Sequence, residues 1–142
     1  MLELPNPSSR GRVLAVDDCE AMRDILCAAL EALGYSVQAV DSGAAALEAA
    51  GQGGFDAIVL DVEMPGLDGM AVGRALRGNP KTAATRIAMH SSIAEADVRA
   101  GFSQYDAFVP KPCNPLALGQ QVDGLIRSRA PANAALTAQQ AG

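Results

Sequence analysis

Residues 57–66 read Ala57-Ile58-Val59-Leu60-Asp61-Val62-Glu63-Met64-Pro65-Gly66, an apolar run that ends in an aspartate just before a turn. The run does not alternate with polar residues, which is typical of a strand that is buried on both faces of a parallel sheet. A carboxylate at the end of such a strand is costly to desolvate unless a partner compensates for its charge. Because ligands bind at the carboxyl ends of strands in open α/β sheets, Asp61 is a candidate binding residue.

A second apolar run, Val13–Val16, ends in the acidic pair Asp17-Asp18. If the two runs are parallel strands of one sheet, three carboxylates lie at the same edge. Alternatively, Asp17 or Asp18 caps a helix that starts near Glu20, where free backbone N–H groups favour an acidic residue. That interpretation suits an isolated aspartate, whereas the pair together with Asp61 favours a site for a divalent cation.

Strand and helix patterns alternate along the chain. The expected strands are 13–16, 36–40, 57–60, 86–89 and 107–109, and the expected helices are 20–33, 44–50, 69–77, 93–100 and 116–129. Asn114 is the expected N-cap of the last helix, with Pro115 at its first position. This alternation predicts an α/β fold with a parallel sheet and helices on both faces. The flanks 1–10 and 130–142 are expected to be flexible, which leaves one domain at 11–129.

Composition excludes several classes of protein. The chain has 142 residues, of which 49% are hydrophobic, and a net charge of −5, which fits a globular domain and disfavours direct nucleic-acid binding. No window has the roughly 18 to 20 apolar residues that span a bilayer, and the first residues do not resemble a signal peptide, so no membrane insertion is expected. The three cysteines, Cys19, Cys27 and Cys113, lack metal-binding spacing, so we expect a reduced, cytoplasmic protein.

Several short motifs lie at the ends of the expected strands. They are Asp17-Asp18 with Met22-Arg23, Asp61 with Met64-Pro65-Gly66 and Asp68-Gly69, Ser91, and Lys111-Pro112. In this order they resemble a response-regulator receiver domain, most closely the single-domain chemotaxis (CheY-like) type, over about residues 11–129. The resemblance implies a flavodoxin-like fold, a five-stranded parallel sheet with the strand order 2-1-3-4-5.

The resemblance also implies a role for each site residue. Asp61 would accept a phosphoryl group from a histidine kinase, with Mg²⁺ reducing the repulsion between the two anions. Asp18, Asp61 and the backbone carbonyl of Glu63 would bind the metal, and Asp17 would act through water or behind these ligands. Lys111 would contact the phosphoryl oxygens and stabilise the charge of the transition state.

Further expectations concern the switch between inactive and active states. Ser91 would bond to the phosphoryl group, and the space that its hydroxyl leaves would admit the ring of Phe108. Because phenylalanine has no hydroxyl, we expect Phe108 to favour the inward rotamer even without phosphate. The alternatives are that Ser91 and Ser92 cap the next helix and that Phe108 is an ordinary core residue. The Lys111-Pro112 peptide bond is expected to be cis.

Two residues near these motifs leave alternatives open. Glu63 follows Asp61 by two positions, and an acidic side chain there can either repel a phosphoryl group or position a water. His90, the only histidine, is either a buried core residue or a neighbour of the site.

Two functional classes follow from the resemblance. The first is a stand-alone, non-enzymatic switch that binds a downstream protein through its last strand and last two helices. The second is a phosphoryl relay or phosphate sink between a histidine kinase and another phosphotransfer protein. A Mg²⁺-dependent phosphatase of another fold is disfavoured, because it needs a second aspartate where Glu63 stands.

Overall fold

The computed structural model describes residues 9–128. The predicted flexible flanks therefore lie outside the described residues, except for Ser9 and Arg10. The backbone N–H of Arg10 donates to the carbonyl of Gly34 at 2.9 Å, and the hydroxyl of Ser9 donates to the carbonyl of Gly11 at 2.7 Å. These two residues belong to the folded unit, which thus begins before the predicted boundary at Gly11.

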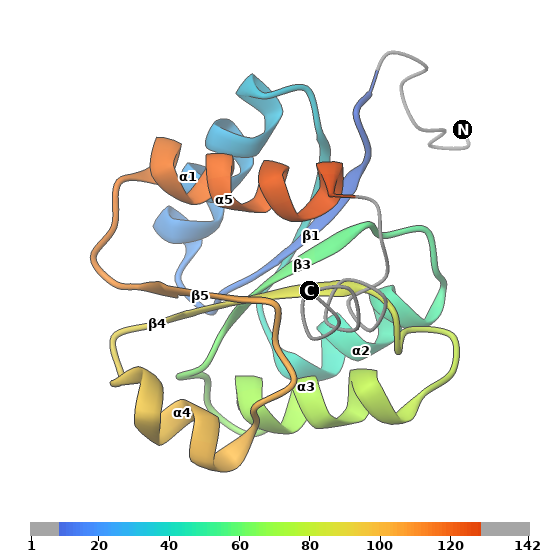
Figure 1. The fold of residues 1–142 in the computed structure, drawn as a ribbon, viewed down its shortest axis with the longest axis vertical. Helices are drawn as coiled ribbons and strands as arrows, with labels where there is room; N and C mark the ends of the chain where they lie inside the picture. Colours follow the sequence, from blue (N-terminus) through green and yellow to red (C-terminus); the bar gives the residue numbers. More distant parts are fainter. Residues whose placement is uncertain (1–8, 129–142) are drawn as a thin grey trace, which may run out of the picture.

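Five parallel strands form one sheet in the order β2-β1-β3-β4-β5 (Figure 1). The strands are β1 Arg12–Val16, β2 Ser36–Val40, β3 Ala57–Asp61, β4 Arg86–Ser91 and β5 Ala107–Pro110. The helices are α1 Glu20–Ala32, α2 Gly43–Gly51, α3 Gly69–Gly78, α4 Glu95–Gly101 and α5 Pro115–Arg127. The predicted α/β fold and its strand order are confirmed.

Helices cover both faces of the sheet, α1 and α5 on one side and α2, α3 and α4 on the other (Figure 1). Strand β3 lies at the centre and is buried along its whole length. Its residues alternate between the two apolar cores, with Ile58 and Leu60 in one and Ala57 and Val59 in the other. This two-sided burial explains the unbroken apolar run in the sequence, and it holds Asp61 at a defined position at the strand end.

The fourth helix differs most from the prediction. It begins at Glu95 rather than Ile93, and its N-cap, Ala94, makes no side-chain hydrogen bond. The alternative that Ser91 and Ser92 cap this helix is therefore wrong. Instead, the hydroxyl oxygen of Ser91 accepts a hydrogen bond from the backbone N–H of Ile93 at 2.9 Å, within the turn before the helix.

The last helix begins as predicted. Asn114 is the N-cap, and its side chain accepts a hydrogen bond from the backbone N–H of Leu116. Pro115 occupies the first helical position, where a missing N–H costs nothing. The helix ends at Arg127, two residues before the predicted end at 129.

Gly69 starts α3 directly against the end of β3. A Cβ atom at this position would lie 2.2 Å from the backbone oxygen of Asp61, far inside contact distance. We expect Gly69→Ala to lower the free energy of unfolding by about 2–3 kcal/mol, because α3 and β3 must move apart. Gly78→Ala is the control, since a Cβ atom there meets nothing within 4 Å. Urea denaturation measures both variants, and equal stabilities would contradict the close approach at Gly69.

Candidate functional site

Three carboxylates meet at the carboxyl edge of the sheet. Asp17 and Asp18 follow β1, Asp61 ends β3, and one oxygen of each lies within 4.8 Å of the others. The pairing of Val16 with Leu60 aligns the two strand ends and explains this convergence. Asp17 and Asp61 are 1% and 2% exposed, whereas Asp18 lies at the surface. The sequence-based expectation of three carboxylates at one edge is met by the geometry.

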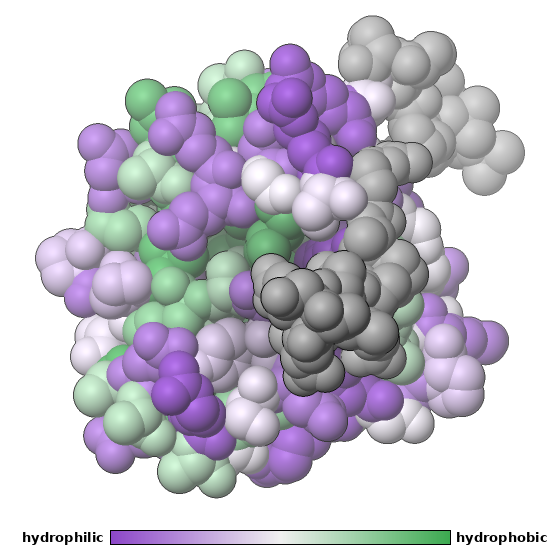
Figure 2. All heavy atoms as spheres, in the orientation of Figure 1, coloured by the Kyte–Doolittle hydropathy of each residue, from purple (hydrophilic) through white to green (hydrophobic). Residues whose placement is uncertain are grey.

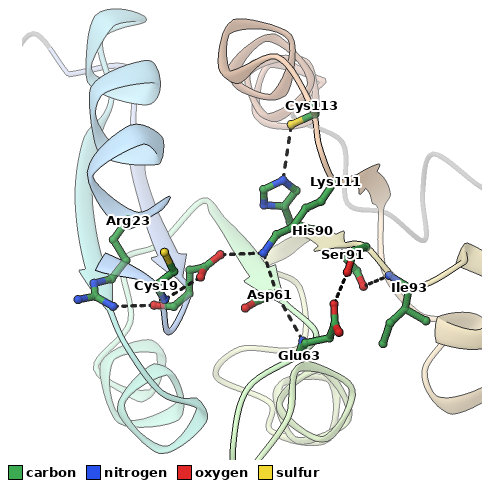
Figure 3. Close-up of polar contacts among 11 residues, drawn as sticks. Cys19, Arg23, Asp61, Glu63, His90, Ser91, Ile93, Lys111 and Cys113 are labelled. Atoms are coloured by element: carbon green, nitrogen blue, oxygen red, sulfur yellow. Dashed lines mark hydrogen bonds and ion pairs between the residues drawn. The ribbon is translucent and has the colours of Figure 1, made fainter. Parts of the chain in front are cut away.

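The loop between β1 and α1 holds Asp17 by both its side chain and its backbone. Its Oδ1 accepts a hydrogen bond from the backbone N–H of Cys19, and its carbonyl accepts one from the guanidinium of Arg23, each at 2.9 Å (Figure 3). Cys19 is the N-cap of α1 and has no side-chain capping bond. The alternative that Asp17 or Asp18 caps this helix is therefore wrong.

Lys111 lies between the two buried carboxylates. Its ammonium donates to Oδ2 of Asp17 and to Oδ1 of Asp61, each at 3.2 Å (Figure 3). The backbone N–H of Lys111 donates to the carbonyl of Ser91 at 2.8 Å, which ties the loop after β5 to β4. The peptide bond from Lys111 to Pro112 is cis, as predicted.

The charges of the site are unequal, because one ammonium faces two buried carboxylates and a third at the surface. Burial raises the pKa of Asp61 to about 6, the charge of Asp17 adds to this rise, and Lys111 opposes it. Burial tends to lower the pKa of Lys111, but Asp61 and Asp17 outweigh it and the pKa is raised. An excess of oxygen donors and negative charge fits a hard divalent cation such as Mg²⁺.

The loops after β3 and β4 are joined by a contact that the sequence did not indicate. The hydroxyl of Ser92 donates to Oε1 of Glu63, and the backbone N–H of Glu63 donates to Oδ1 of Asp61 at 3.3 Å. The carboxylate of Glu63 is thereby directed to Ser92 rather than left free. Ser91, beside this contact, is 1% exposed at the end of β4. No spacing rule could have found a pair that belongs to two different loops.

Phe108 on β5 is half-buried and packs against the core formed with α3 and α4. Its ring centroid lies 6.1 Å from that of Tyr105, which in turn lies 6.3 Å from that of Phe102. The hydroxyl of Tyr105 donates to Glu95 at the start of α4. A half-buried ring is neither fully inward nor outward, so the inward preference of Phe108 stays a prediction.

His90 is both a core residue and a neighbour of the site. It pairs in register with Asp61 and is 2% exposed, and its Nε2 lies 3.5 Å from the sulfur of Cys113. Its Nδ1 has no hydrogen-bond partner among residues 9–128. Burial, with a contribution from the charge of Lys111, lowers the pKa of His90 to about 4. The imidazole is therefore neutral at pH 7.

The pH dependence of folding tests this environment. The pKa of His90 falls from 6.5 to about 4 on folding, so its contribution to stability is complete above pH 6.5 and is lost toward pH 4. We expect His90→Leu to gain about 2 kcal/mol relative to the unsubstituted protein as the pH falls from 7 to about 4.5. Urea denaturation at both pH values measures this difference, and a constant difference would contradict the buried, neutral imidazole.

Comparison with known proteins places this geometry in context. The model of the response regulator receiver domain family matches residues 13–123. The transcriptional activator protein PfeR of Pseudomonas aeruginosa is 35% identical over 128 residues, which cover 89% of this chain and 40% of PfeR. Response regulator MprA of Mycobacterium leprae is 38% identical over 129 residues, which cover 87% of this chain and 54% of MprA. The chain thus spans about half, or less, of the length of these relatives.

Solved structures agree with the fold. The chemotaxis protein CheY4 of Vibrio cholerae superposes with a TM-score of 0.76 at 28% identity, over 81% of this chain and 98% of CheY4. Response regulator TrrA of Thermotoga maritima, solved in complex with Mg²⁺ and beryllofluoride, superposes with a TM-score of 0.72 at 29% identity, over 81% of this chain and 98% of TrrA. Among the described residues, no helix has the length and apolar character needed to cross a bilayer.

Proposed function

The chain belongs to the response-regulator receiver family of two-component signalling, and from this we propose that Asp61 accepts a phosphoryl group from a histidine kinase. One observation carries the proposal: a buried aspartate at a strand end contacts a lysine and lies within reach of two further carboxylates. A structural ion pair would need only one carboxylate for each ammonium. The surplus negative charge supports a site that binds a metal and a phosphoryl group.

In the proposed reaction, a carboxylate oxygen of Asp61 forms a bond to the phosphorus, and the P–N bond of the donor phosphohistidine breaks. The imidazole leaves with the bonding electrons, and the donor takes up a proton. Lys111 contacts Asp61 directly, so its ammonium is placed to stabilise the negative charge on the transferring oxygens. Ser91 then supplies a hydroxyl to the bound phosphoryl group from the end of β4.

The carboxylates of Asp18 and Asp61 and the backbone carbonyl of Glu63 would hold Mg²⁺, with Asp17 acting through water. When bound, Mg²⁺ neutralises charge on the aspartate and on the phosphoryl oxygens. Asp18 lies at the surface, so it can exchange water for the metal without opening the core. Asp17 is held by Cys19 and Lys111, which favours an indirect role.

We further propose that phosphorylation changes the binding of a downstream protein to α4, β5 and α5. Strand β5 forms the edge of the sheet between these helices, and apolar side chains gather there in the space-filling view (Figure 2). Ser91 and Phe108 would couple the site to this face, because Phe108 contacts Tyr105 and Tyr105 bonds to α4. PfeR and MprA are longer than this chain, so a stand-alone switch is part of the proposal.

Intact-mass measurement tests the chemistry. We expect one added phosphoryl group after incubation with phosphoramidate and Mg²⁺, and none when EDTA removes the metal. An adduct that forms equally well in EDTA would argue against the proposed site. If no adduct accumulates, binding of beryllofluoride with Mg²⁺, followed by NMR, separates rapid hydrolysis from a site that does not bind the group at all.

A further inference from the structure

Basic side chains gather at the end of the sheet opposite to Asp61. The residues are at the amino ends of strands, in the adjoining loops or at the end of α5, namely Arg10, Arg12, Lys81, Arg86 and Arg127. In Figure 1 this is the end at which the chain enters β3 and β4. The net charge of −5 therefore conceals a basic end, and none of these cations has a role in the proposed phosphoryl transfer.

A cavity of about 330 Å³ lies at this basic end. It is bounded by the loop before β3, the loop before β4 and the last turn of α5. The residues that matter here are Phe55, Asp56, Lys81, Thr85, Arg86 and Ile126. Two cations and a hydroxyl thus face a space large enough for a small molecule.

Arg86 is the unusual member of this set. It is 9% exposed, and its recorded hydrogen bond joins Nε to the carbonyl of Leu125 at 3.4 Å. Within the part of the chain that the structure describes, its two terminal nitrogens donate no hydrogen bond and it makes no ion pair. A buried cation without an anion is costly, so the cavity presents a charge that lacks its partner.

Arg77 shows how this chain pairs an arginine of similar burial. Its guanidinium contacts Asp106 at 3.0 Å and also donates to the backbone carbonyls of Ala83, Thr85 and Gln104. Arg77 thus joins the loops before β4 and β5 with its donors satisfied. The contrast with Arg86 indicates that the free nitrogens of Arg86 are not simply the usual state of a half-buried arginine here.

One carboxylate also faces the cavity. Oδ2 of Asp56 accepts a hydrogen bond from the backbone N–H of Arg12 at 2.9 Å, so part of its charge is already compensated. The guanidinium of Arg12 lies over the ring of Phe55, 4.3 Å from its centroid, and so contributes to the wall. Asp56 repels an anion on its own side, which leaves the side of Lys81, Thr85 and Arg86 as the favourable position.

We propose that this cavity binds a small oxyanion, a phosphate or carboxylate group of a soluble molecule. The terminal nitrogens of Arg86 would bind two oxygens, because the planar guanidinium matches the spacing of these groups. Lys81 would add a point charge from the rim, and the hydroxyl of Thr85 would add a donor. The site is independent of the chemistry proposed for Asp61 and lies at the other end of the sheet.

NMR titration of the full chain with inorganic pyrophosphate tests the proposal. EDTA is present, so that no divalent ion links pyrophosphate to the acidic site. We expect saturable shifts of the backbone amides of Phe55, Thr85 and Arg86, with the dissociation constant rising at least about tenfold in Arg86→Met and in Lys81→Met. Arg99→Gln, which removes an exposed cation from α4, should leave the titration unchanged.

A parallel titration with citrate distinguishes the two ligand sources. Saturation with pyrophosphate alone would assign a phosphate ligand, and saturation with both would assign a general oxyanion site. Shifts that do not saturate, that are confined to amides around Lys111, or that persist in Lys81→Met would overturn the proposal. Lys81 is exposed, so its variant keeps the test decisive even if Arg86→Met fails to fold.

Discussion

Asp61→Asn is expected to abolish the phosphoryl adduct, with a loss of at least about 10³-fold in the rate of its formation, because an amide is not a nucleophile for phosphorus. The same substitution is expected to stabilise the protein in EDTA at pH 7 by roughly 1–3 kcal/mol. The reason is that the ionised carboxylate is unfavourable in its buried position next to Asp17, which raises its pKa to about 6. Intact-mass spectrometry and urea denaturation measure the two effects.

The pH dependence gives the stability effect a defined sign. The pKa of Asp61 is 3.8 in the unfolded reference and about 6 in the fold, so the folded protein holds this proton more tightly. The penalty of the charge is complete above pH 6 and disappears toward pH 4. The advantage of Asp61→Asn should therefore shrink as the pH falls through that window. Asp24→Asn, on the exposed face of α1, is the control for the substitution itself. A variant that still forms the adduct would remove Asp61 from its proposed role.

Lys111→Met is expected to slow phosphoryl transfer by about 10²–10³-fold. The acid limb of the pH–rate profile should also move to higher pH, because the charge of Lys111 lowers the pKa of Asp61. The substitution leaves Asp17 and Asp61 without their cation, so the free energy of unfolding at pH 7 should fall by roughly 1–3 kcal/mol. The loss should be smaller at pH 5, where Asp61 is largely protonated.

Lys81→Met provides the matched control for this second variant. It makes the same substitution at an exposed position at the opposite end of the sheet. Phosphoryl transfer should be unchanged in Lys81→Met, whereas Lys111→Met should lose it. Single-turnover transfer from a phosphorylated histidine kinase, measured over pH 5–9, compares the two. An unshifted acid limb in Lys111→Met would show that the contact with Asp61 does not control the pKa.

Local sequence patterns were sufficient to predict the order and the type of every element between residues 12 and 127. The reason is that strands buried on both faces, such as β3, produce unbroken apolar runs, whereas amphipathic helices produce a period of 3.6 residues. The convergence of Asp17, Asp18 and Asp61 also followed, because parallel strands place their carboxyl ends at one edge. The start of α4 did not follow, since Ala94 offers no capping side chain to mark it.

The contacts between loops depended on the tertiary structure alone. The bond from Ser92 to Glu63, the approach of His90 to Cys113 and the ion pair of Arg77 with Asp106 each join residues more than 20 positions apart. Such contacts carry no periodic signal, because they depend on how loops and side chains pack after the sheet has formed. The burial of Arg86 without an anion is of the same kind. Its basic character is visible in the sequence, but its lack of a partner arises only from the packing of the loop before β4 against the end of α5.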